Sequence, residues 1–508
     1  MTARPKAMAE NPKRRRRALM AQGCVLTSSV VAVSASTSFQ GRNVSDNPDY
    51  ETTRQRHLAA ALEQLPGYLE RLKWPRERLR QERQGRLRRL LERARERSPW
   101  HRRRLAHLDL SRLDEGQLTL IPPMTKDELM LCFDQIVTEP QLTLSRVEDH
   151  LAGLNSDAYL CDSYHAVASG GSSGRRGVYV YDWNGWIGWY LTVLRQMFPI
   201  LAAHTPPGTR IAGAVVAAER ATHASSAAAQ TFRDSGLIAW SRYAITDPFQ
   251  EQVARLNQLQ PSVLATYPSL LHQLSFAQEA GELKIAPRLV LSSAEPLLAE
   301  TRASVERVWG CPVINSWASS EAGGMGVGCG QGTGLHLSDD LLIIEPVDRE
   351  GRPVPPGVRS SKIYVTNLFN EVLPLIRFEI SDEVTVLDHH QQACPCGSSH
   401  RLAADVEGRL DDSFEYAGVA PIHPQLFRTR LGRERHVVEY QVRQRPGGVD
   451  VYLREQGPTD LIQLRNDLIA SLSQAGLEQP LVLVHTKAAF ERTSAGKFKR
   501  FVPLGSAG

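Results

Sequence analysis

From Ser163 onward, short apolar runs rich in β-branched residues alternate with longer segments of helical periodicity. A buried strand is a short run of Val, Ile and Leu, whereas a helix repeats its apolar positions every three to four residues. The pattern predicts strands at 178–182, 210–217, 262–266 and 289–291, and helices at 248–259, 269–280 and 296–309. Strands that alternate with helices build a sheet covered by helices, so we expect an α/β fold.

The regions on either side have different patterns. Residues 54–108 have leucines at helical spacing, and Thr125 with Glu128 forms a capping box that predicts a helix start. After Leu335 the strands are shorter and separated by Gly and Pro, and after Gly408 a smaller α+β segment follows. We therefore expect a large region of several α/β subdomains over 51–408 and a small α+β domain over 409–508.

Residues 1–50 differ from the rest of the chain. Four arginines at 14–17 precede a mildly apolar stretch at 18–36, which is the order of an export signal. Polar residues such as Gln22 and Thr27 interrupt the apolar stretch, and it is too polar to span a bilayer. We prefer a disordered or processed extension, and an export signal is the alternative.

Composition narrows the class of protein. The chain has 508 residues, of which 42% are hydrophobic and 23% charged, with a formal net charge of +5. These values are typical of a globular protein and exclude a wholly disordered, collagen-like or polytopic membrane protein. Seven cysteines are too few for a disulfide scaffold in so long a chain. We expect a reducing, cytoplasmic location and no membrane partner.

Arginines are concentrated between Arg71 and Arg104. Such a stretch could bind nucleic acid, but it lacks interleaved aromatic side chains on which bases could stack. The alternative is an amphipathic helix whose arginine side chains are solvated. We prefer the helix and expect no nucleic-acid partner.

The densest run of small residues follows Ala168 and ends at Gly177, directly before the strand predicted at 178–182. Backbone N–H groups in such a loop can approach phosphate oxygens, and hydroxyls add donors. The loop matches neither Walker A nor the dinucleotide fingerprint. By itself it could equally be a flexible hairpin. Its candidate phosphate-binding residues are Ser169, Gly170, Gly171, Ser172, Ser173 and Gly174.

Further motifs follow the glycine-rich loop in a fixed order. They are Asn-Ser-Trp-Ala-Ser-Ser-Glu at 315–321, Pro-Leu-Ile-Arg-Phe-Glu-Ile-Ser-Asp at 374–382, Cys-Pro-Cys-Gly at 394–397, Gly-Arg-Leu-Asp-Asp at 408–412 and Thr-Ser-Ala-Gly-Lys at 493–497. This order resembles the adenylate-forming superfamily, and within it the phenylacetate–CoA ligase family. The resemblance covers roughly residues 75–503.

The resemblance implies a two-step reaction that uses ATP and Mg²⁺. A carboxylate attacks the α-phosphorus of ATP, which gives an acyl-adenylate and pyrophosphate, and a thiol, usually that of coenzyme A, then displaces AMP. It also implies that the small C-terminal domain is mobile and pivots at Asp411 between the two steps. The expected substrate is a small aryl or arylacetic acid.

The resemblance also assigns roles to individual residues. Lys497 matches the lysine that bridges the carboxylate and the α-phosphate, and Glu321 matches the glutamate that directs Mg²⁺. The glycine-rich loop would hold the pyrophosphoryl end of ATP. The remaining nucleotide-binding candidates are Trp317 beside the adenine, Ser320, Asp382 on the ribose hydroxyls and Arg409 on the ribose or phosphate.

Several positions depart from the family pattern. Arg175 and Arg176 replace a Lys-Pro pair in the loop, and Trp317-Ala318 replaces Tyr-Gly. Charge and hydroxyl groups survive, so the nucleotide site is modified but complete. The departures leave the acceptor open. The acceptor could be a carrier-protein thiol or an amine instead of coenzyme A. A further alternative is a divergent relative that binds nucleotide without catalysis. For the assembly, a homodimer is an open possibility.

Four residues suggest a metal site. Cys394 and Cys396 form a close thiol pair, and Cys329 and His336 lie upstream in glycine-rich sequence. Three thiolates and one imidazole suit a closed tetrahedral Zn²⁺ site. The spacing is not that of a zinc finger, and the alternative is a set of reduced, unliganded cysteines.

Overall fold

The computed structural model describes the chain from residue 48 to residue 504, apart from 170–176, 207–208, 210, 218–221, 234, 236–237, 333, 389–392, 405, 407, 410–412, 420, 423, 432–433, 435, 456 and 493–497. Most of the predicted N-terminal extension therefore lies outside the described residues. The extension predicted over 1–50 ends earlier in the structure, because residues 48–50 begin a helix. Tyr50 is buried and donates a hydrogen bond to Asp157 at 2.6 Å, so these residues belong to the folded part.

The N-terminal part is helical, as the leucine spacing predicts. The buried leucines of its most basic helix lie on one face, and its arginines cover the other, so the basic stretch is an amphipathic helix packed on the domain. The predicted capping box is present, since the Thr125 hydroxyl accepts the N–H of Glu128 and the Glu128 carboxylate accepts that of Thr125. The helices of this part are α2 (Pro48–Arg71), α3 (Arg76–Arg97), α4 (Pro99–Arg104), the 3₁₀ helix η1 (Glu115–Leu120), α5 (Lys126–Leu131), α6 (Phe133–Ile136) and α7 (Leu144–Gly153).

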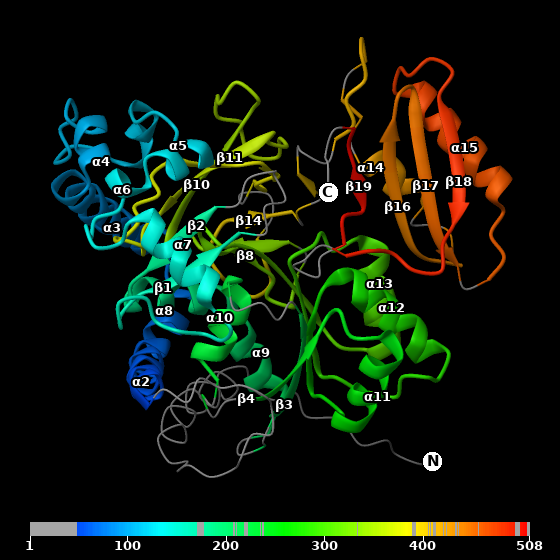
Figure 1. Ribbon diagram of the computed structural model, residues 1–508, viewed down its shortest axis with the longest axis horizontal. Helices are drawn as coiled ribbons and strands as arrows, with labels where there is room; N and C mark the ends of the chain where they lie inside the picture. Colours follow the sequence, from blue (N-terminus) through cyan, green and yellow to red (C-terminus); the bar gives the residue numbers. More distant parts are fainter. Residues whose placement is uncertain are drawn as a thin grey trace, which may run out of the picture.

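A sheet of eight strands, counted over the described residues, lies at the centre of the molecule in the order β14-β9-β8-β7-β6-β5-β3-β4 (Figure 1). Strands β3 to β7 run parallel, and β8, β9 and β14 extend the sheet in antiparallel fashion. The strands are β3 (Ile211–Ala217), β4 (Ile238–Ala244), β5 (Val263–Thr266), β6 (Leu289–Ser293), β7 (Val313–Ser319), β8 (Gly323–Val327), β9 (Leu335–Leu337) and β14 (Leu402–Ala403).

Helices cover both faces of this sheet, which confirms the predicted α/β fold. One core joins the sheet to α11, α12 and α13 through residues such as Leu256, Leu271 and Val290, and another joins the opposite face to α9 through residues such as Ile200. The helices are α8 (Trp183–Leu194), α9 (Met197–His204), α10 (Ala224–Thr231), α11 (Phe249–Leu259), α12 (Pro268–Glu279) and α13 (Ala299–Trp309). The bounds of α11, α12 and α13 lie within a few residues of those predicted from periodicity.

Over the described residues, three smaller sheets flank the large one, and the two that follow Leu335 agree with the predicted change to shorter strands. They contain a hairpin of β1 (His165–Ala168) and β2 (Val178–Tyr181), a sheet of β10 (Leu342–Val347), β11 (Lys362–Asn367) and β12 (Phe378–Ile380), and a pair of β13 (Asp382–Glu383) and β15 (Gly408–Arg409).

A buried ion pair ties helix α8 to the turn between β9 and β10. Arg195 donates from both terminal nitrogens to the two carboxylate oxygens of Asp340, each at 2.7 Å. Both side chains are at most 2% exposed. Arg71 from α2 lies 3.8 Å from the same carboxylate, so three segments far apart in sequence meet at one buried negative charge.

The C-terminal part has a hydrophobic core of its own, made of residues between Phe414 and Phe501. Figure 1 shows it beside α12 and α13. It contains a four-stranded sheet in the order β18-β17-β16-β19 with two helices. Its elements are α14 (Gln425–Leu431), β16 (Val437–Arg445), β17 (Gly448–Glu455), α15 (Leu461–Gln474), β18 (Leu481–Thr486) and β19 (Phe501–Val502). Among the described residues, no helix is long and apolar enough to cross a membrane.

Candidate active site

The glycine-rich loop connects β1 and β2, as its position before a strand predicts. Ser169 closes the base of the loop, because its hydroxyl accepts the N–H of Gly177 at 2.8 Å and its own N–H bonds to the Gly177 carbonyl at 2.9 Å. A Cβ at Gly177 would overlap the Tyr179 hydroxyl, so only glycine fits there. The other five candidates of the loop, Gly170, Gly171, Ser172, Ser173 and Gly174, lie outside the described residues.

Glu321 lies in the tight turn between β7 and β8, next to the glycine-rich hairpin. Its carboxylate accepts a hydrogen bond from the Tyr179 hydroxyl at 2.7 Å, and its carbonyl accepts one from the Asn367 amide at 2.9 Å. The Tyr181 hydroxyl bonds to the carbonyl of Ser320. Burial and the Glu321 carboxylate raise the pKa of Tyr179 far above its ordinary value, so this phenol stays protonated and acts as a donor. The carboxylate is therefore fixed at the base of the loop.

Trp317 and Asp382, which lie 65 positions apart, form a direct hydrogen bond. The indole Nε1 donates to Asp382 Oδ2 at 2.7 Å, and both side chains are buried. Arg409 lies directly opposite Asp382 in the β13–β15 pair, although only the backbone of Arg409 is described. The structure thus brings together a flat aromatic ring, a carboxylate and the backbone of a third candidate residue.

The carboxyl ends of the parallel strands β5, β6 and β7 meet at one edge of the sheet, where open α/β folds bind ligands. Thr266, Ser292 and Asn315 lie side by side in the registers of these strands. The tryptophans of α8 belong to the core, since Trp186 and Trp189 are buried and stacked with ring centroids 5.3 Å apart.

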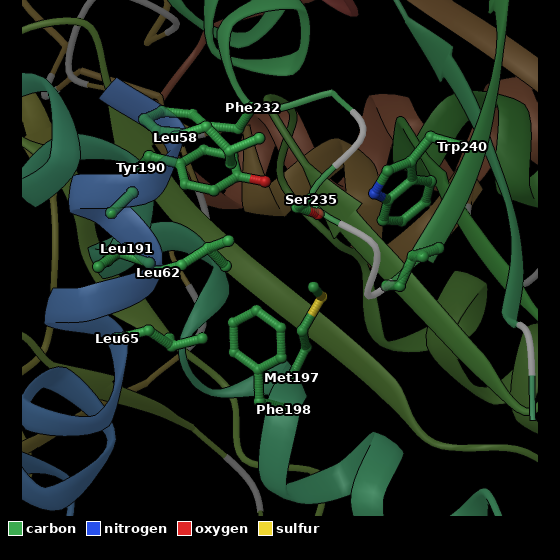
Figure 2. A pocket seen from close by; sticks show the side chains of 12 residues that line it. Leu58, Leu62, Leu65, Tyr190, Leu191, Met197, Phe198, Phe232, Ser235 and Trp240 are labelled. Atoms are coloured by element: carbon green, nitrogen blue, oxygen red, sulfur yellow. The ribbon is translucent and has the colours of Figure 1, made fainter. Parts of the chain in front are cut away.

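A separate apolar cavity lies between α2, α8, α9 and the edge strand β4 (Figure 2). Leu62, Tyr190, Phe198 and Trp240 are among its lining residues. Its volume of about 20 Å³ is close to that of one water molecule, whereas ligand pockets usually exceed roughly 300 Å³. This cavity is therefore too small to hold an aromatic acid.

The small C-terminal domain is docked on the large region beside helix α12. Its Arg492 donates to the Ser269 hydroxyl at 3.0 Å, and the N–H of Phe498 donates to Glu295 at 2.9 Å. A cavity of about 440 Å³ remains between α12 and α13 on one side and α14 and β16 on the other. Lys497 and the expected pivot Asp411 lie outside the described residues.

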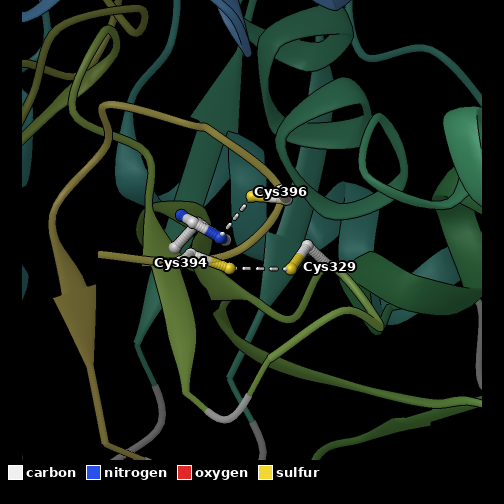
Figure 3. Close-up of side chains that lie close together, drawn as sticks. Cys329, Cys394 and Cys396 are labelled. Carbon is white, nitrogen blue, oxygen red and sulfur yellow. Dashed lines mark hydrogen bonds between the residues drawn. The ribbon is translucent and has the colours of Figure 1, made fainter. Parts of the chain in front are cut away.

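The four residues of the expected metal site come together beside β9, between the end of β8 and the segment before β14 (Figure 3). One ligand atom from each of Cys329, His336, Cys394 and Cys396 lies within 4.8 Å of all the others. The Cys329 and Cys394 sulfurs are 3.4 Å apart, and the Cys396 sulfur is 3.3 Å from Nε2 of His336. Zn–S bonds of about 2.3 Å in a tetrahedron give ligand separations near 3.8 Å, so the cluster fits zinc with small adjustments.

Sequence reasoning missed three residues that organise this site. Tyr179 and Tyr181 occupy one face of β2 and reach the Glu321 turn with their hydroxyls. Two tyrosines at strand spacing after a glycine-rich loop were an available signal. Glu295 binds the C-terminal domain, and nothing in its local sequence indicates a partner 203 positions away.

Several known CoA ligases are similar to this chain in sequence or in fold. No protein-family model matches the chain. A phenylacetate–coenzyme A ligase of Pseudomonas putida is 25% identical over 229 residues, which are 44% of this chain and 48% of that protein. The match therefore spans about half the length of this curated relative.

Solved structures match over nearly the whole chain. A 2-hydroxyisobutyryl-CoA ligase in the postadenylation state in complex with R3-HIB-AMP has a TM-score of 0.69 and 17% identity, covering 92% of this chain and 95% of that one. The same ligase in the thioesterification state, in complex with 2-HIB-AMP and CoA, has a TM-score of 0.55 and 18% identity, covering 85% and 91%. The resemblance found in the motifs is thus confirmed: this chain has the fold of the adenylate-forming acyl-CoA ligases and is similar in sequence to phenylacetate–coenzyme A ligase.

Proposed function

We propose that the protein activates a small carboxylic acid with ATP to an acyl-adenylate and then transfers the acyl group to the thiol of coenzyme A. AMP and pyrophosphate leave in the process. An aryl or arylacetic acid is the expected substrate class, because the curated relative is a phenylacetate–coenzyme A ligase. Phosphoryl chemistry of this kind needs positioning and charge neutralisation more than covalent help from the protein.

The observation that carries the proposal is the hydrogen bond between Trp317 and Asp382. A planar ring and a buried carboxylate held side by side match the two halves of an adenosine: a base that stacks and a ribose whose hydroxyls donate. The neighbouring Glu321, fixed by Tyr179 at the base of the glycine-rich loop, offers a hard carboxylate for Mg²⁺ between phosphates.

We also propose roles for the remaining candidate residues. Ser169 and its loop would hold the pyrophosphoryl group, Lys497 would bridge the carboxylate and the α-phosphate, and Arg409 would reach the ribose or phosphate. The small domain, which we assign to residues 409–508, would pivot at Asp411. Its docked position supports adenylation, because the chain superposes better on the postadenylation state of the neighbour than on its thioesterification state.

ATP–pyrophosphate exchange across a panel of aryl, arylacetic and short hydroxy acids tests the proposal. Exchange that depends on one class of acid would establish adenylation and identify the acid. Free acyl-CoA on addition of CoA would then separate the proposed acceptor from a carrier-protein thiol or an amine. A folded protein that binds ATP yet exchanges with no acid would contradict the proposal.

We further propose that Cys329, His336, Cys394 and Cys396 hold a structural Zn²⁺. The site would bind the β8–β9 turn to the segment before β14, which pairs with β9 through Leu402 opposite His336. With all four positions filled by protein ligands, the metal has no open position for a substrate and would act on stability rather than chemistry.

Replacing Cys394 and Cys396 together by serine should remove the zinc, because two of its four ligands are lost. Elemental analysis of the purified protein should give about one zinc per chain in the wild type and almost none in the double variant. Cys132→Ser is the matched control, since Cys132 lies outside the cluster. Zinc content that is unchanged in the double variant would rule the site out.

A further inference from the structure

The segment that carries Lys497 is attached to the large region at both of its described ends. On one side, Arg492 donates from Nη1 to the Ser269 hydroxyl at 3.0 Å. On the other, the backbone N–H of Phe498 donates to Glu295 Oε1 at 2.9 Å. Of the two partners in the large region, Ser269 lies at the start of α12 and Glu295 lies just after β6.

Glu295 makes a second bond that fixes its own position. Its other oxygen, Oε2, accepts the N–H of Ser269 at 3.0 Å, in the first turn of α12. N–H groups in the first turn of a helix have no partner within the helix, and a carboxylate is favoured there by the helix dipole. One carboxylate therefore joins the N-terminus of α12, within the large region, to the backbone of the small domain.

The partners of Arg492 extend this contact. Its Nη2 bonds to Glu439 at 2.8 Å, and Glu439 also accepts a hydrogen bond from Gln273 of α12 at 3.3 Å. Glu439 is buried, and Arg492 is only 16% exposed. The contact is polar and directional, which suits a domain that docks in one defined position and can also leave it.

We propose that Glu295 is a positioning residue for adenylation: by holding the N–H of Phe498, it sets the place of the neighbouring Lys497 relative to the large region. This inference rests on the proposed function. Glu295 does not touch the reacting atoms in the proposal, and its effect is confined to the half-reaction that uses the docked arrangement. An error of about 1 Å in the place of a reacting group can cost roughly 100-fold in rate.

The substitution Glu295→Gln tests the proposal with nearly the same side-chain shape. An amide keeps one acceptor oxygen but turns the other into an NH₂ donor, which would face an N–H. We expect acid-dependent ATP–pyrophosphate exchange to fall by about 10- to 100-fold. Formation of acyl-CoA from preformed acyl-adenylate and CoA should change less than about two-fold, because that step does not use this contact.

Two further variants define the effect. Arg492→Ala removes the other anchor and should reproduce the same split between half-reactions. The double variant should lose less than the sum of the two single losses, because both residues support one arrangement. Glu306→Gln on the exposed face of α13 makes the same charge change away from the contact and should leave both half-reactions unaltered.

Deuterium uptake by the peptide that contains Phe498 gives a readout independent of activity. It should be faster in Glu295→Gln than in the wild type and unaltered in Glu306→Gln. Unaltered uptake, equal loss of both half-reactions, or full exchange activity in Glu295→Gln would overturn the inference. If the wild type showed no exchange with any acid, the proposed function would be contradicted instead. The uptake measurement would still show whether Glu295 holds the N–H of Phe498.

Discussion

Lys497→Ala should lower acid-dependent ATP–pyrophosphate exchange by about 100- to 1,000-fold, the usual loss when one preorganised group that stabilises a developing negative charge is removed. The ammonium is expected between two anions, the carboxylate and the α-phosphate, which otherwise repel each other. ATP affinity should change little, because the Trp317–Asp382 pair and the glycine-rich loop remain. Exchange assays together with ATP titration measure both quantities.

Lys499→Ala is the matched control for this variant. Lys499 lies two positions further on, and the contact that holds it, from the Gln441 amide to the Lys499 carbonyl at 2.8 Å, uses only the backbone. Loss of the Lys499 side chain should leave exchange within about two-fold of the wild type, because alanine keeps this backbone contact. If Lys497→Ala retained full exchange, or if both variants lost activity equally, the assignment of Lys497 would be wrong.

Asp340→Ala should destabilise the protein by about 3–5 kcal/mol, because it leaves the Arg195 guanidinium buried without its counter-charge. Chemical denaturation followed by circular dichroism measures the free energy of unfolding. Asp348→Ala removes a surface carboxylate paired with Arg352 and should have little effect. Replacing Arg195 and Asp340 together by Met and Leu should recover part of the loss, since the charge of Arg195 disappears with its partner while that of Arg71 remains.

The same pair gives a pH dependence with a definite sign. Burial alone would raise the pKa of Asp340, but the Arg195 guanidinium outweighs it and holds this pKa below the ordinary range of aspartate. The pair therefore stabilises the fold above the unfolded pKa of about 4, and this contribution is lost as the pH falls toward the folded value. The difference in stability between wild type and Asp340→Ala should narrow in acid, and a constant difference from pH 7 to pH 3 would contradict the account.

Local features were predictable from the sequence. Apolar spacing placed α11, α12 and β5 within a few residues, because periodicity depends only on which face is buried. The capping box of Thr125 and Glu128 was predictable for the same reason, since both partners lie in one turn. The cluster of three cysteines and a histidine was predictable in membership but not in geometry.

Contacts between distant segments could not be predicted in this way. The bond from Tyr179 to Glu321 depends on the hairpin lying against the β7–β8 turn, and the bond from Phe498 to Glu295 depends on where the small domain docks. Neither position follows from spacing along the chain. The resemblance to a known family suggests the proposed roles of Glu321 and Asp382, and the structure shows that Tyr179 and Trp317 bond to their carboxylates.

The short β13–β15 pair has a mechanical consequence for the proposed cycle. Asp382 and Arg409 are register partners there, and the proposed pivot at Asp411 follows just past this pair. The part of the chain that would not rotate thus includes the ladder that carries Asp382, the proposed ribose-binding carboxylate. If the small domain rotates at Asp411, the proposed nucleoside contacts would stay in place, so the acyl-adenylate would remain bound while the acceptor enters. Retention of the acyl-adenylate between the two steps would then depend on the β13–β15 pair and not on the position of the small domain.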